Sequence, residues 1–240
     1  MARHTLRPAT AGGRPALGCA GLPGVRVPET LIGIGENYWP AGTGARTPSR
    51  VPLVFGKFAG SVVPSGAEIL VPEGADVVCE GELAVVVGRT AKDLDGPDAA
   101  LRCLAGVTVA NDVSARDLQA ADVQSTRGKS LDTFCPLGPE LVTLDDVGNL
   151  DDLVVVTRVD GRVVQRSSTA RMVFGVAELV VFCSRFMTLY PGDVILTGTP
   201  AEQRDEDLRI RPGQTVEVEI DGVGLLTNPV RAAHPGPSRR

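Results

Sequence analysis

The apolar segments of this 240-residue chain are short, rich in valine and isoleucine, and repeatedly interrupted by glycine and proline. This pattern predicts β-strands joined by turns. The clearest strands lie in LAVVVG, GVTVAND, LVVVTRVDGRVV, DVILTG and TVEVEIDGVGLL. Asp-Gly pairs inside two of these segments indicate β-hairpins. We therefore expect a β-dominated α+β domain with a mixed sheet and few helices.

Two helices are expected within this domain. One follows Ser114, because the sequence S-A-R-D fits a capping box. The other covers MVFGVAELVVFCSRFM, whose apolar residues are too continuous for an exposed helix. We expect the packed domain to span residues 31–230, preceded by a short arm or strand pair at 1–30 and followed by a mobile tail at 231–240.

Charge and cysteine content narrow the partners and the compartment. A net charge of -5 leaves no basic surplus for nucleic-acid phosphates or an anionic membrane surface. The five cysteines are widely spaced and include no C-x-x-C pair, which is typical of reduced thiols in a cytosol. No apolar stretch approaches the roughly 18 residues of a membrane span. We expect a cytoplasmic protein that binds neither nucleic acid nor membrane.

Acidic residues stand at the beginning of one strand and at the end of another. In CEGELAVVVG, Glu80 and Glu82 are two residues apart on a strand, so both project from one face. Asp112 ends the strand in VTVAND. Carboxylates without nearby cysteine or histidine favour Mg²⁺, Mn²⁺ or Ca²⁺ over zinc. Considered alone, however, two such glutamates more often form a solvated strand face, and the aspartate a cap or turn.

The chain resembles the fumarylacetoacetate hydrolase superfamily, in particular its short acylpyruvase and 2-hydroxyhepta-2,4-diene-1,7-dioate isomerase-like members. The blocks that match, in the family's order, are CEGELAVVVGRTAKDL, AGVTVANDVSARDLQ, STRGKSLDTFCPLGP, ELVVFCSRFMTLYPGDVILTGTP and IRPGQTVEVEIDGVGLLTN. The resemblance implies a mixed β-sandwich roll, a homodimer, and a Mg²⁺ or related ion that helps the enzyme act on 2-oxo acids or β-dicarbonyl compounds.

The same resemblance assigns roles to individual residues. Glu80, Glu82 and Asp112 match the family's metal ligands. Gln119 matches a glutamine that orients substrate or water, and Lys129 matches a site lysine whose cation could offset the anionic charge and stabilise an enolate. Thr199 in TGTP matches a residue near the substrate's oxygens. Independently of the resemblance, Arg46 lies on a basic loop rich in glycine and proline that could close over an anionic substrate, although such a loop is more often simply solvated. Arg116 and Asp117 are interpreted as structural, because they lie in the first turn of a helix.

The sequence departs from the family at a His-Glu pair that activates water in members that cleave carbon–carbon bonds. In GENYWPAGTGARTP, Ala41 and Gly44 stand at the corresponding positions. The chain has two histidines, His4 and His234, and both lie outside the expected domain. Glu36 is the nearest acidic residue that could replace the pair, although it is also typical of an exposed loop.

These features favour a divalent-metal-dependent enzyme that acts on a small 2-oxo acid or β-dicarbonyl substrate through a metal-bound enolate. Decarboxylation, tautomerisation or isomerisation, and hydration would all use that step, whereas hydrolysis also needs an activated water. We therefore expect a lyase or isomerase rather than a hydrolase. The alternatives are a classical hydrolase with a different water-activating base, and a catalytically silent binding protein with the same fold.

Overall fold

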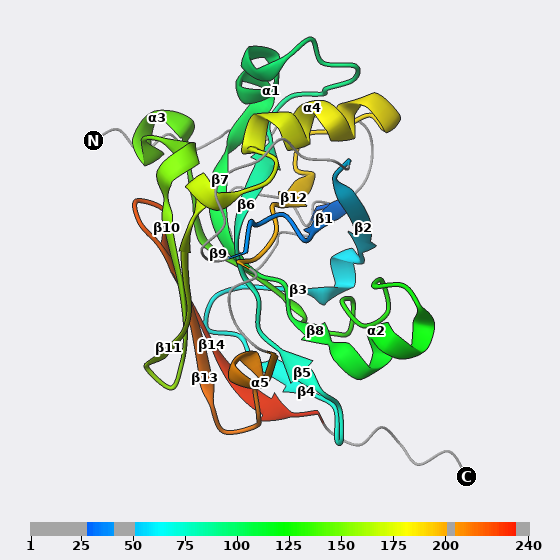
Figure 1. The fold of residues 1–240 in the computed structure, drawn as a ribbon, viewed down its shortest axis with the longest axis vertical. Helices are drawn as coiled ribbons and strands as arrows, with labels where there is room; N and C mark the ends of the chain where they lie inside the picture. The colour runs from blue at the N-terminus through cyan, green and yellow to red at the C-terminus, as the bar shows by residue number, and fades with distance from the viewer. Residues whose placement is uncertain (1–27, 41–50, 201–204, 234–240) are drawn as a thin grey trace, which may run out of the picture.

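The computed structural model describes residues 28–40, 51–200 and 205–233. Its larger sheet has seven strands, which in spatial order are β2 (Leu53–Lys57), β1 (Leu31–Gly35), β12 (Val194–Leu196), β6 (Gly81–Val87), β7 (Leu104–Asn111), β9 (Cys135–Val142) and β3 (Val62–Val63). The second sheet has five strands, in the order β11 (Arg162–Ser168), β10 (Val154–Val159), β13 (Thr215–Ile220), β14 (Gly224–Ala232) and β4 (Ile69–Val71). A small ribbon pairs β5 (Val77–Val78) with β8 (Ser114–Ala115). Figure 1 shows the arrangement.

Both large sheets are mixed, as the strand pattern predicts. β1 pairs in parallel with β12, β3 with β9, and β14 with β4, while the other strand pairs are antiparallel. The two hairpins also lie where the Asp-Gly pairs indicate them. At the β10–β11 turn both Asp160 and Gly161 have positive φ, 50° and 76°, which is the backbone that a two-residue type I′ turn requires.

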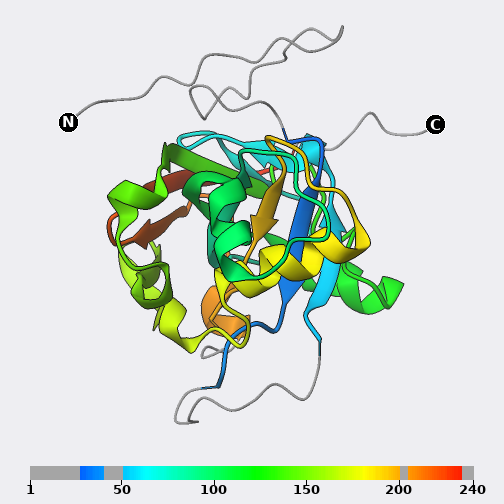
Figure 2. The ribbon, with the colours of Figure 1, turned by 90° about the horizontal axis from the view of Figure 1, so that it is seen from above.

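Short helices connect and cover the sheets. They are α1 (Pro97–Cys103), α2 (Arg116–Asp122), α3 (Leu144–Val147), α4 (Val176–Phe186) and α5 (Asp205–Leu208), with 3₁₀ turns at Ala59–Ser61, Leu150–Asp152 and Thr169–Arg171. α1 and α4 pack together at one end of the molecule (Figures 1 and 2). Among the described residues, no helix combines the length and the apolar character that a membrane span needs.

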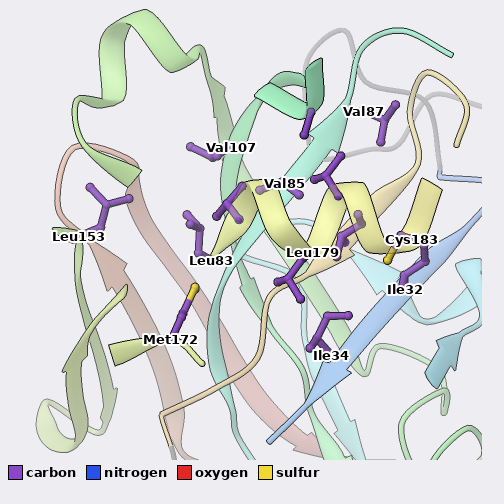
Figure 3. Packing of buried hydrophobic residues seen from close by; sticks show 14 of the residues in the cluster. Ile32, Ile34, Leu83, Val85, Val87, Val107, Leu153, Met172, Leu179 and Cys183 are labelled. Atoms are coloured by element: carbon purple, nitrogen blue, oxygen red, sulfur yellow. The ribbon is translucent and has the colours of Figure 1, made fainter. Parts of the chain in front are cut away.

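The main core lies between α4 and the two sheets. Leu179 and Cys183 of α4 belong to one buried cluster with Ile32 and Ile34 of β1 (Figure 3). This helix is the second of the two that the sequence predicts, and its apolar face is buried as expected.

β6 is buried on both of its faces, and this determines where the acidic residues lie. Leu83, Val85 and Val87 point into the main core, whereas Ala84 and Val86 enter a smaller cluster on the opposite face. Side chains alternate along a strand, so Glu82 projects on the same side as Ala84. A carboxylate is therefore held inside the protein at the beginning of a buried strand.

Candidate functional site

The pairing of β6 with β7 brings three carboxylates together. Gly81 lies opposite Asn111 in this antiparallel pair, and the backbone N–H of Asp112 donates to the carbonyl oxygen of Glu80 at 2.8 Å. Glu80 and Asp112 are thus neighbours across the strands, and Glu82 follows two residues along the same face. One carboxylate oxygen from each residue lies within 4.8 Å of the others, and all three residues are buried. The structure therefore brings together the three residues that the sequence predicts as ligands.

Three cations surround these carboxylates. Lys129 Nζ donates to Glu80 Oε2 at 2.6 Å and also contacts Asp112 Oδ2. Lys57 Nζ donates to Asp112 Oδ1 at 2.6 Å and to the carbonyl oxygen of Phe134 at 2.9 Å. Arg116 Nη2 donates to Glu80 Oε1 at 2.6 Å. The formal charges of the three acids and three bases cancel, which is what allows so many ionisable groups to be buried together.

The surroundings perturb the pKa values of these groups in different directions. Burial raises the pKa of Glu82 well above its ordinary value, and the charges of Asp112 and Glu80 raise it further. Burial also raises the pKa of Asp112, but Lys129 and Lys57 outweigh this effect and hold it below its usual value. Burial lowers the pKa of Lys129, whereas the neighbouring carboxylates raise it more, so this lysine stays protonated at neutral pH.

Glu82 is held by the segment that follows β12. The backbone N–H of Gly198 donates to Glu82 Oε2 at 2.7 Å, and the hydroxyl of Thr197 donates to the carbonyl oxygen of Leu83 at 2.8 Å. Gly198 has a φ of +99°, and a Cβ there would lie 2.7 Å from the Cβ of Asn37. Only glycine combines this backbone conformation with this close approach.

Replacement of Gly198 by alanine is therefore expected to destabilise the protein more than the same change at Gly192. Gly192 has nearly the same φ, +98°, but a Cβ there would meet nothing within 4 Å. Gly192→Ala should cost about 1–2 kcal/mol from backbone strain alone, and Gly198→Ala about 1–3 kcal/mol more from overlap with Asn37. Denaturant unfolding of both variants measures the difference. Equal losses would show that the contact with Asn37 is unimportant.

Gln119 is connected to the carboxylates by Arg116, which donates hydrogen bonds to both Gln119 and Glu80. Its Oε1 accepts from Arg116 Nη1 at 3.1 Å, so the amide nitrogen is the end that can donate to a substrate or water. A Cβ at Gly128 would lie 2.6 Å from Gln119 Cγ and 2.8 Å from the carbonyl oxygen of Ala115. The glycine before Lys129 therefore lets α2 pack closely against the segment that carries the lysine.

One expectation about α2 is corrected by the structure. Ser114 is not the N-cap, because the helix begins at Arg116 after Ala115 and has no side-chain cap. The Ser114 hydroxyl lies instead within hydrogen-bonding distance of Glu80 Oε2, at 3.1 Å, and of the Asp112 carbonyl oxygen, at 2.9 Å. Arg116, which the sequence suggests is structural, forms an ion pair with Glu80 and so helps to hold that carboxylate in place. Helix position alone gave no indication that its side chain turns toward a neighbouring strand.

Lys57 is the site residue that sequence reasoning missed. Its side chain is buried although lysine is almost always exposed, and FGKFAG carries no motif that distinguishes it. The one available signal is its place at the end of a strand between Gly56 and Phe58. Thr199, which was predicted to lie near the substrate, donates its hydroxyl proton to the carbonyl oxygen of Gly81 at 3.1 Å, between the two glutamates.

Several residues singled out in the sequence lie outside the described part of the chain. They are the loop residue Arg46, the positions Ala41 and Gly44 where the family's His-Glu pair would stand, and both histidines. The described residues therefore contain no histidine.

The carboxylates fit a hard divalent cation. Oxygen ligands lie about 2.0–2.6 Å from Mg²⁺ or Ca²⁺, so two ligands of one ion are at most about 4–5 Å apart. The 4.8 Å limit on the separations between the carboxylate oxygens is consistent with that spacing. The residues that would hold the ion are Glu80, Glu82 and Asp112, and with three protein oxygens its shell would have room for water and a chelating substrate.

The chain belongs to the fumarylacetoacetate hydrolase family, because the family described as "Fumarylacetoacetate (FAA) hydrolase C-terminal" matches residues 30–231. Among curated relatives it is similar to oxaloacetate tautomerase FAHD2A, mitochondrial, of Bos taurus, with 43% identity over 210 residues that cover 85% of this chain and 67% of the relative.

Solved structures show the same relationship. A 5-carboxymethyl-2-hydroxymuconate delta-isomerase from Mycobacterium smegmatis is 40% identical with a TM-score of 0.80, covering 87% of this chain and 81% of that one. Maleylpyruvate hydrolase from Sphingobium sp. SYK-6, in complex with manganese(II) ion and pyruvate, is 25% identical with a TM-score of 0.75, covering 87% and 72%. The predicted β-dominated family fold is confirmed, and the protein is an enzyme of this family, akin to its tautomerases and isomerases.

Proposed function

We propose that this enzyme interconverts the keto and enol forms of a small 2-oxo dicarboxylate, with oxaloacetate as the leading candidate, and that it uses Mg²⁺ or Mn²⁺. The observation that carries the proposal is the buried triad of Glu80, Glu82 and Asp112 among three cations. With all three carboxylates ionised, as metal ligands must be, the residue charges balance, so a divalent ion would leave an excess of about two positive charges. A dianionic chelating substrate would neutralise that excess.

The protein's own groups support enolate chemistry. When bound, a divalent ion acts as a Lewis acid on the oxygens of an oxo acid. Lys129, buried and protonated, supplies a cation and its one remaining N–H where negative charge develops on the substrate. The amide nitrogen of Gln119 is available to orient the substrate or a water. The named relatives add support, since one is an oxaloacetate tautomerase and another an isomerase.

The identity of the metal is part of the proposal. Carboxylate ligands favour Mg²⁺, Mn²⁺ and Ca²⁺, and the maleylpyruvate hydrolase structure contains manganese. We favour Mg²⁺ in the cell, with Mn²⁺ as the practical substitute in experiments.

Ultraviolet absorbance of the enol form of oxaloacetate follows the proposed reaction directly. Purified protein should accelerate the decay of freshly dissolved enol in Mg²⁺ or Mn²⁺, and EDTA should abolish the acceleration. Coupled detection of pyruvate in the same sample tests decarboxylation, and acylpyruvates test hydrolysis. Rapid pyruvate release from acylpyruvates, without tautomerase activity, would favour the hydrolase alternative.

We further propose that the enzyme is a homodimer. β2 is the outer strand of the larger sheet. Its first residue, Leu53, is 53% exposed, and Phe58, which directly follows the strand, is 65% exposed. An edge strand with exposed apolar side chains is a surface that natural proteins usually cover. Sedimentation at micromolar concentration measures the oligomeric state, and a monomer at all concentrations would reject the proposal.

We also propose a cytoplasmic location, for which the support is the state of the cysteines. Cys79, Cys103 and Cys183 are buried free thiols, as expected in a reducing compartment. The Bos taurus relative is mitochondrial by name. Fractionation of the source cells would distinguish the two compartments.

A further inference from the structure

A continuous chain of hydrogen bonds connects the second sheet to the metal-binding strand. Its central residue is Gln165 of β11, which is fully buried. Gln165 Oε1 accepts from the hydroxyl of Thr157 at 2.8 Å, and its Nε2 donates to Thr199 Oγ1 and to the carbonyl oxygen of Pro200, both at 2.8 Å. Thr199 Oγ1 in turn donates to the carbonyl oxygen of Gly81 at 3.1 Å.

The chemistry of these groups fixes the direction of every bond. The carbonyl oxygen of Pro200 can only accept, so the end of the Gln165 amide beside it must be the NH₂ group. The second N–H of that group then points at Thr199 Oγ1, which receives it with one lone pair. The single hydroxyl proton of Thr199 is committed to Gly81. What Thr199 retains is one lone pair and no proton.

We propose that Gln165 is a positioning residue: together with the carbonyl oxygen of Gly81, it holds the Thr199 hydroxyl in the orientation that makes it a hydrogen-bond acceptor toward the substrate. A ligand oxygen that meets Thr199 must then bring its own proton, as the hydroxyl of an enol does and the carbonyl of a keto form does not. The network would thereby favour the enol form at this position. The inference rests on the proposed function and deepens it, because it names the tautomer that the site recognises.

Gln165 and Thr199 are far apart in sequence, and neither role follows from a motif. A purely structural role is the competing explanation, since Gln165 also connects β10 and β11 to the segment after β12. If the network is only a structural tether, its loss should weaken the binding of every ligand by the same factor. If Thr199 is an acceptor, its loss should weaken the binding of ligands that carry a hydroxyl and leave the binding of other ligands unchanged. The two explanations can therefore be separated by measuring affinities.

Binding of lactate and pyruvate in saturating Mn²⁺ separates the two explanations, because these ligands differ in having a hydroxyl or a carbonyl at the second carbon. Thr199→Val should weaken lactate binding about 2- to 10-fold, the value of one hydrogen bond, and change pyruvate binding less than about 2-fold. Thr199→Ser should restore the wild-type ratio of the two affinities. Gln165→Leu, which cannot donate to Thr199 and no longer fixes the orientation of its hydroxyl, should shift the ratio toward pyruvate.

Thr157→Val is the matched control, because it removes a hydrogen bond at the other end of the Gln165 amide and leaves the donation to Thr199 in place. Its ratio of affinities should equal that of the wild type. Equal weakening of both ligands by Thr199→Val and by Gln165→Leu would overturn the inference and leave the proposed function intact. Failure of the wild-type protein to bind either ligand with Mn²⁺ would overturn the proposed function, and the inference with it.

Discussion

Glu82→Gln is expected to abolish the response of the protein to divalent ions and to lower ion-dependent activity by at least about 100-fold. Changes to residues that only support metal ligands typically cost about 10- to 100-fold, and Glu82 is itself one of the three carboxylates. The substitution preserves side-chain size but replaces an anionic ligand with a neutral amide. Calorimetric titration with Mn²⁺ and the enol assay measure the two losses. Glu219→Gln is the control, because Glu219 pairs with Arg158 and its side chain is 43% exposed.

The same variant should change how the stability of the metal-free protein depends on pH. The folded state raises the pKa of Glu82, so the proton on this carboxyl favours folding at low pH and that contribution is lost as pH rises through the raised value. From about pH 5 upward, wild-type protein in EDTA should lose stability relative to Glu82→Gln until the pH exceeds the raised pKa. Thermal unfolding of both proteins across this range measures the effect. A difference that does not vary with pH would show that Glu82 is ionised throughout.

Lys57→Met should destabilise the protein by about 3–5 kcal/mol, the usual cost of removing one partner from a buried ion pair. The side chain of Lys57 is fully buried and that of Asp112 almost so, and the substitution leaves Asp112 with Lys129 as its remaining charged partner. Saturating Mg²⁺ should recover part of the loss, because the ion supplies new positive charge to Asp112.

Lys92→Met provides the comparison for Lys57. Lys92 is an exposed lysine whose contacts are two backbone carbonyls and the exposed Asp93, so its loss should cost less than about 1 kcal/mol. Denaturant unfolding measures both variants. Equal small losses would mean that the carboxylate cluster does not depend on Lys57.

The sequence was most informative where local chemistry and family motifs agree. The Asp160–Gly161 hairpin could be predicted because its turn needs positive φ at two adjacent positions. Convergence of Glu80, Glu82 and Asp112 could be predicted from the E-x-E spacing together with the motif that contains Asp112. The motif was needed because spacing alone does not give the register of β6 against β7.

What could not be predicted depends on contacts between distant segments. Ser114 satisfies a local capping pattern, yet Glu80 lies within reach of its hydroxyl. Lys57 and Gln165 come from β2 and β11, and each contacts a residue that is distant in the sequence, Asp112 and Thr199 respectively. Burial of a polar residue produces no periodic pattern in the sequence, because it depends on hydrogen-bond partners that lie in distant segments of the chain.

The central claim is that Glu80, Glu82 and Asp112 bind one divalent ion and leave room for a chelating oxo acid. A crystal structure with Mn²⁺ and oxalate, analysed by anomalous scattering at the manganese edge, tests it most directly. The expected result is one manganese peak about 2–2.6 Å from an oxygen of each carboxylate, with both oxalate oxygens on the same ion. A manganese peak elsewhere, or oxalate bound without the ion, would contradict the claim.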